Sequence, residues 1–205
     1  MKKRTKVLLL LLSAMLLVAA SVMGTLAYLT SQADVKNTFT VGKVGITMTE
    51  SKVDENGKAI ADTSTDSNAY KLIPGHEYDK DPTITVDSNS ESCWLFVEVK
   101  NGIKALEDSN NTIHNQITTT NGWKQLENVT TSDVYYKFWN KEAADVSYTV
   151  PVFSSFKIAT NAQSDETNWT NNLEVKVTAY AIQADGINEA STAWSYLMDQ
   201  LNPGN

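Results

Sequence analysis

The spacing of hydrophobic residues predicts a protein built mainly of β-strands. Apolar and polar residues alternate with a period of two, and aromatic and β-branched residues dominate, in the runs 37–48, 83–86, 93–100, 134–139, 147–156 and 173–183. In the strongest run, CWLFVEVK, one face is apolar throughout, whereas the other begins with Trp94 and Phe96 and then becomes charged. We therefore expect this strand to be buried on both faces at one end and half exposed at the other.

Interruptions in the alternation predict where strands bend or end. The run 37–48 changes phase at Gly42-Lys43, which predicts a β-bulge, because a slip of one residue would otherwise turn half of the apolar side chains to water. Pro151 interrupts the run 147–156 and predicts a bend or an edge strand. Residues 51–68 are polar and predict a surface loop or a weak hairpin.

Helical periodicity is clear only near the end of the chain. An apolar stripe runs through residues 187–201, comprising Ile187, Ala190, Trp194, Leu197, Met198 and Leu201. Asp185-Gly186 precedes this segment and Asn202-Pro203-Gly204 ends it. We expect the apolar stripe to pack on a sheet or cover its edge, with a helix that binds a partner as the alternative. A second, short helix is expected within 103–108.

These elements together predict one domain. About eight short strands followed by one late amphipathic helix favour a two-sheet antiparallel sandwich over residues 28–205. The chain has no internal repeat and no composition shift that would mark a second domain.

The first residues have the composition of a secretory signal peptide. A basic start, containing Lys2, Lys3, Arg4 and Lys6, is followed by an apolar run over 7–20 and by small residues at Thr25 and Ala27. We expect a signal-peptide helix in 1–27 and cleavage before Tyr28. The alternative is an uncleaved membrane anchor, because the interrupted apolar stretch continues to Leu29 and reaches the roughly 20 residues that a spanning helix needs.

The net charge and the cysteine content exclude some classes of partner and an internal disulfide. Four of the 17 Lys and Arg residues lie before residue 28 and all 24 Asp and Glu residues lie after it, so residues 28–205 carry a net charge of −11. Such acidity argues against nucleic acid or anionic lipid as a partner. The single cysteine, Cys93, cannot form an internal disulfide, and its apolar surroundings predict a small buried hydrophobic residue.

Residues that could carry chemistry are sparse, and we predict no catalytic residue, metal site or cofactor. His76-Glu77 is not part of a zinc-protease motif, because Lys80 stands where the second histidine would be required. No Gly-x-Ser-x-Gly or phosphate-binding glycine loop occurs. The acidic turns 54–57 and 79–81 are the only calcium candidates, and neither has EF-hand spacing.

Four segments resemble a known family of exported proteins. They are GTLAYLT at 24–30, NTFTVG at 37–42, LIPGHE at 72–77 and AIQADG at 181–186, the last followed by Ala193-Trp194. Together they resemble the TasA/camelysin-like proteins of Gram-positive bacteria, which are cut by a SipW-type signal peptidase. The resemblance implies a jelly-roll-like β-sandwich, secretion, and a place at the cell surface or in the biofilm matrix.

The same resemblance implies assembly into extracellular fibres. In TasA-like proteins the N-terminal segment of one subunit adds as a strand to the next, so residues 28–41 are a candidate donor strand here. Its side chains would be those of Tyr28, Leu29, Val35, Phe39 and Val41. The partner would be another copy of the chain or a related matrix subunit. The alternative is that Phe39 and Val41 belong to an ordinary first strand packed within their own subunit.

The leading expectation is therefore a secreted, non-enzymatic surface or matrix protein that contacts the membrane only through an uncleaved signal segment. An alternative is a monomeric adhesin whose binding face would use Trp123, Trp139 and Trp169, with packing in the core or at an edge as the competing expectation for each of them. A third alternative is a camelysin-like secreted protease, which would depend on His76 or on a pair of carboxylates.

Overall fold

The computed structural model describes residues 30–34, 37–38, 40–41, 44–130, 132–141, 146–162 and 173–202. Its larger sheet has six strands in the order β2-β1-β12-β7-β9-β8, and all neighbours are antiparallel. Their bounds are β1 Thr30–Asp34, β2 Asn37–Thr38, β7 Cys93–Asn101, β8 Lys124–Gln125, β9 Asp133–Trp139 and β12 Val175–Gln183.

The second layer is a four-stranded sheet in the order β10-β6-β4-β3. Its strands are β3 Thr40–Val41, β4 Val44–Thr49, β6 Thr83–Val86 and β10 Tyr148–Pro151, and a separate pair is formed by β5 Glu77–Asp79 and β11 Ser155–Lys157. The β5–β11 pair continues the register of β6–β10 beyond Pro82, which has no N–H to donate. Across this break the N–H of Val152 donates to the carbonyl of Pro82 at 2.9 Å.

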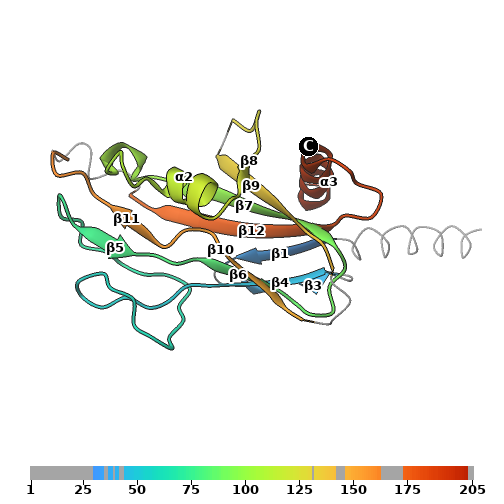
Figure 1. Cartoon of the computed structure of the whole chain (residues 1–205), viewed down its shortest axis with the longest axis horizontal. Coiled ribbons are helices and arrows are strands. Elements are labelled where there is room, and N and C mark those ends of the chain that lie inside the picture. Colours follow the sequence, from blue (N-terminus) through green and yellow to red (C-terminus); the bar gives the residue numbers. More distant parts are fainter. Residues whose placement is uncertain are drawn as a thin grey trace, which may run out of the picture.

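The two sheets pack face to face around a shared core (Figure 1). Along β7 the buried side chains that point to the second sheet are at alternate positions, as the period of two predicted. The core includes Cys93, Leu95, Val97, Val99, Ile46, Ile84, Val86, Val177 and Ala179. The expected mainly β architecture with antiparallel, facing sheets is therefore confirmed.

The C-terminal helix α3 (Ala190–Leu201) lies over the outer face of the six-stranded sheet, as Figure 1 shows. Its buried face contacts Phe96, Val134, Tyr180 and Ile182 in a second apolar cluster. The ring of Trp194 lies 5.2 Å from that of Phe96. The prediction that this helix covers the sheet is confirmed, although the helix begins at Ala190 and not at Ile187. Within the part of the chain that is described, no helix is long and apolar enough to cross a membrane.

The β-bulge expected at Gly42-Lys43 is wrong. Val41 pairs with Val44 and Thr40 with Gly45, so the chain reverses direction between β3 and β4. The change of phase in the sequence therefore separates two neighbouring strands of a hairpin. A tight reversal and a bulge both shift the alternation, and only the pairing distinguishes them.

The other predicted interruptions, loops and turns agree better with the structure. Strands β10 and β11 lie at an edge on either side of a short interruption, as Pro151 predicted. Residues 51–68 contain no strand and only isolated bridges, which confirms a loop. The helix expected within 103–108 is a short 3-10 turn, η1 (Lys104–Leu106).

Two short helical segments follow η1 and had no clear signal in the sequence. They are α2 (Ile113–Asn115) and a π-helical turn, η2 (Gln116–Thr120). Thr112 caps α2, because its side chain accepts a hydrogen bond from the N–H of Asn115 at 3.1 Å. Ile113 and Ile117 are buried in the core between the sheets, which fixes this segment over one end of the sandwich.

Candidate functional site

Most residues that the sequence singled out at the N-terminus fall outside the described part of the chain. These are the cleavage residues Thr25, Ala27 and Tyr28 and the donor residues Leu29, Val35 and Phe39. Val41 is described through its backbone, as the last residue of β3 paired with Val44. Cleavage and strand donation therefore stay predictions.

Strand β1 occupies one edge of β12 in the same chain. Its five residues pair with the stretch of β12 from Ile182 back to Thr178, while the other edge of β12 pairs with β7 along its whole length. Residues 177–182 of β12 are all buried. An N-terminal strand therefore covers the edge of an interior, largely apolar strand. The alternative that the sequence left open concerned Phe39 and Val41: Val41 pairs with Val44 of its own chain, and Phe39 lies outside the described residues.

A group of three aromatic side chains lies on the outer face of the six-stranded sheet, beside the start of α3. We call Trp94, Tyr136 and Phe138 the aromatic ledge. The ring of Trp94 lies 5.0 Å from that of Phe138 and 6.0 Å from that of Tyr136, in edge-to-face geometry. The indole N–H of Trp94 donates to the carbonyl of Ile187 at 2.9 Å, which fixes the orientation of the ring.

Two surface hollows adjoin the aromatic ledge, and both are lined by Trp94 and Phe138. The first, of about 820 Å³, extends toward the connection between β12 and α3 and also contains Gln183 and Asn188. The second, of about 730 Å³, lies on the other side and extends toward β8 and the first turn of α3. Phe138 is 51% exposed between them. The ledge is therefore an open aromatic surface with polar space on both sides.

The tryptophans that the sequence suggested as a binding face do not form one. Trp123 is 2% exposed and donates its indole N–H to the carbonyl of Pro151 at 3.0 Å, and Trp139 is 8% exposed. Trp169 lies outside the described residues. The binding face is wrong for Trp123 and Trp139, and the competing expectation of core packing is confirmed for both. Trp139 pairs with Cys93 and shares its inward direction, and Trp123 belongs to the same core cluster. The alternate position, Phe138, faces outward.

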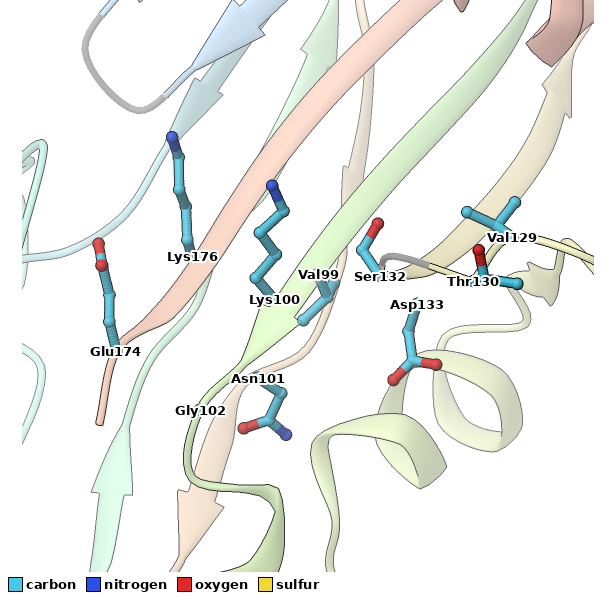
Figure 2. A pocket seen from close by; sticks show the side chains of 10 residues that line it. All are labelled: Val99, Lys100, Asn101, Gly102, Val129, Thr130, Ser132, Asp133, Glu174 and Lys176. Atoms are coloured by element: carbon cyan, nitrogen blue, oxygen red, sulfur yellow. The ribbon is translucent and has the colours of Figure 1, made fainter. Parts of the chain in front are cut away.

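A third hollow, of about 470 Å³, lies at the end of β7 and the start of β12, and Figure 2 shows the side chains around it. Lys100 and Lys176 are directly opposite each other on neighbouring strands. Glu98 accepts hydrogen bonds from the hydroxyls of Ser132 at 2.7 Å and Tyr180 at 3.1 Å, and Lys100 lies 3.5 Å from it. The two lysines are balanced by the carboxylates of Asp133 and Glu174, which also line the hollow, so it has no net preference for an anion.

A fourth hollow, of about 380 Å³, is lined by Glu107, His114 and Tyr135, together with Lys104 and Asp133. Nδ1 of His114 lies 2.9 Å from the hydroxyl oxygen of Tyr135, and burial raises the pKa of Tyr135. Burial also raises the pKa of Glu107, although its carboxylate accepts hydrogen bonds from the N–H of Ile113 at 2.9 Å and from Asn101 at 3.1 Å. Each carboxylate oxygen of Glu107 thus accepts a hydrogen bond from a neighbouring segment, so the group stabilises the local fold.

The acidic turns and His76 are occupied by contacts within the chain. Oδ1 of Asp54 accepts from the N–H groups of Asn56 and Lys58, and these hydrogen bonds, that of Lys58 foremost, lower the pKa of Asp54. Nε2 of His76 lies 3.1 Å from the carbonyl oxygen of Asn56. Among the described residues, no group of three or more His, Cys, Asp and Glu side chains is arranged to hold a metal ion.

The whole chain was compared with known proteins. No protein-family model, no curated protein and no solved structure matches it.

Proposed function

We propose that the protein is an exported, non-enzymatic component of the Gram-positive cell surface or biofilm matrix that polymerises into fibres by N-terminal strand addition. The resemblance of the sequence to TasA/camelysin-like proteins motivates the proposal and suggests a jelly-roll-like connection of the strands. The partner is a second copy of the chain or a related matrix subunit. A signal peptidase acts first and releases the N-terminus at Tyr28.

One observation carries the proposal. The first described strand, β1, begins at Thr30, close behind the expected cleavage site, and covers the edge of β12. Removing β1 from that edge would expose backbone N–H and C=O groups of a strand whose side chains are buried at residues 177–182. The same segment from another copy could restore the same pairing, because strand exchange between identical chains reproduces the original hydrogen bonds.

The position of β1 also explains how export and assembly would be coupled. While residues 1–27 remain attached, the N-terminal segment is tied to the membrane or to the export machinery. Cleavage frees the end of the chain, and the strand can then leave its own β12 and reach another. Polymerisation would therefore follow release of the signal peptide.

A reversible lock on β1 tests this proposal. Ala33 and Ala179 are directly opposite each other in the β1–β12 pair, at a separation typical of the cysteines in a disulfide. The variant Ala33→Cys/Ala179→Cys, made in residues 28–205 with Cys93→Ala, should stay monomeric when oxidised. The same variant, when reduced, should form fibres like the unmodified chain. Light scattering and electron microscopy over time provide the measurement.

Two outcomes would contradict the proposal. Equal fibre formation by the oxidised and reduced variants would show that β1 need not leave its own subunit. Persistent folded monomers from the unmodified chain with a native Tyr28 end would remove self-assembly altogether. A variant without residues 28–41 is less informative, because loss of β1 exposes β12 and favours aggregation for a different reason.

A further inference from the structure

We propose that the aromatic ledge and the two hollows beside it bind a neutral polysaccharide chain. The site lies on the outer face of the six-stranded sheet, and ligand binding there does not depend on polymerisation. The ligand class is set by three features of the site, namely its fixed aromatic rings, its polar rims and its negative charge.

The aromatic rings form a rigid surface that is left open. Trp94 is held by its hydrogen bond to the carbonyl of Ile187 and by edge-to-face contacts with Tyr136 and Phe138. Phe138 is 51% exposed and lies on β9, the second strand from one edge of the six-stranded sheet. Pyranose rings have apolar C–H faces that pack on aromatic rings, and a fixed ring loses little conformational freedom when it binds.

The rims offer hydrogen-bonding groups of the kind that sugar hydroxyls need. Ser92, Gln183 and Asn188 line the first hollow, and Gln125 and Asn128 line the second. Oε1 of Gln183 is buried and has no hydrogen-bond donor among the described residues. A hydroxyl group or a bridging water brought into the first hollow would supply that donor. A ligand that is apolar on its faces and hydroxylated around its edges matches this arrangement.

The charge around the ledge distinguishes a neutral ligand from an acidic one. Glu91 and Asp185 line the first hollow, with Lys141 3.7 Å from Glu91, whereas Glu127 and Glu189 line the second opposite Lys124 and Lys137. The charges that line the second hollow therefore balance, whereas the first is lined by two carboxylates and by no described lysine or arginine. This local excess, on a chain whose net charge is −7, disfavours nucleic acid and acidic polysaccharides. A second copy of this chain would bring the same negative charge against the rims.

The size of the site favours a chain of several sugars over a single one. The two hollows have volumes of about 820 and 730 Å³, each within the range of roughly 300–1,000 Å³ that is usual for ligand sites. Because both adjoin Trp94 and Phe138, one ligand can cross the ledge and enter both. Affinity should therefore rise with the length of the oligosaccharide.

Calorimetric titration of residues 28–205 with cellohexaose and with N-acetylchitohexaose tests the proposal. At least one of these neutral hexasaccharides should bind with a Kd below about 1 mM. Phe138→Ala should weaken that binding at least tenfold, and Phe138→Trp should retain it. Tyr196→Ala is the matched control, because Tyr196 on α3 is also 51% exposed and does not line either hollow, and it should leave the Kd unchanged.

Three results would overturn the proposal. The first is no binding of either hexasaccharide at millimolar concentration. The second is an equal change in Kd for Phe138→Ala and Tyr196→Ala, which would place the binding elsewhere. The third is binding of an acidic hexasaccharide of galacturonic acid as tight as that of the neutral ones. Near-unchanged unfolding midpoints for the three variants ensure that the comparison reports on binding and not on folding.

Discussion

The ammonium nitrogen of Lys80 lies 2.6 Å from a carboxylate oxygen of Glu50, and both side chains are buried. The other oxygen of Glu50 accepts a hydrogen bond from the amide of Asn68 at 2.6 Å. Glu50 follows β4, Lys80 follows β5, and Asn68 lies in the polar loop between them. This buried pair therefore ties the long loop to the strands at both of its ends.

Removing one partner of the Glu50–Lys80 pair should destabilise the fold strongly. Lys80→Met leaves the carboxylate of Glu50 buried without its counter-charge, and we expect a loss of about 3–5 kcal/mol in the free energy of unfolding. The double variant Glu50→Leu/Lys80→Met should lose less than Lys80→Met alone, because no buried charge remains. Urea unfolding of the variants measures both differences.

The exposed pair Lys58–Asp79 serves as the control. Its atoms lie 3.0 Å apart, but the lysine side chain is 49% exposed. Lys58→Met should therefore change the free energy of unfolding by less than about 1 kcal/mol. Similar losses for Lys58→Met and Lys80→Met would contradict the argument that burial sets the difference.

Cys93 should be unreactive in the folded protein. Its side chain is fully buried in the core, and burial raises the pKa of the thiol to about 12. Reaction requires the thiolate and access to it, so a thiol-specific chromogenic reagent at pH 8 should modify Cys93 rapidly in guanidinium chloride and very slowly without it. Rapid labelling of the native protein would mean that β7 opens far more often than a core strand should.

The strands were predictable because their signal is local. β7, β9 and β12 each follow from a period of two in residues that are adjacent in the chain. The hairpin between Val41 and Val44 was not predictable, because a bulge produces the same change of phase. Only the identity of the partner strand distinguishes a hairpin from a bulge.

The candidate site was less predictable, because it depends on distant contacts. In β9 the alternation separates Phe138 from Trp139, yet nothing in that run says which of the two faces the core. The pairing of Trp139 with Cys93 decides it, and the position of α3 decides how much of the outer face stays open. The Glu50–Lys80 pair was missed for the same reason, since its two charges are far apart in the sequence and each has many alternative partners.

Gly57 should tolerate no side chain. Its φ of +73° lies in the left-handed region, and a Cβ there would overlap the ring of Tyr78. We expect Gly57→Ala to lower the free energy of unfolding by about 1 kcal/mol for the backbone strain and by a further 1–3 kcal/mol for the overlap. Chemical denaturation measures the total.

Gly122→Ala separates these two contributions. Gly122 has a similar φ of +66°, but a Cβ at that position would contact nothing within 4 Å. Its loss should therefore contain only the backbone strain. Equal losses at the two positions would show that the loop around Gly57 moves away from Tyr78 without penalty.

The neighbouring carboxylates of Glu107 and Asp108 should shift stability with pH in opposite directions. Burial raises the pKa of Glu107 above its ordinary value of 4.5, so the folded state holds that proton more tightly than the unfolded state. The contribution of Glu107 is then most favourable below pH 4.5 and is lost as pH rises through the folded pKa. For Asp108, hydrogen bonds from the backbone of Asn110 and from Lys157 lower the pKa below 3.8, so its contribution is present above pH 3.8 and is lost as pH falls through the folded pKa.

Unfolding free energies measured from about pH 3 to 7 for Glu107→Gln and Asp108→Asn check both signs. The advantage of the wild type over Glu107→Gln should decrease with rising pH, and its advantage over Asp108→Asn should increase. Parallel slopes for the two variants would mean that burial does not control the titration of Glu107.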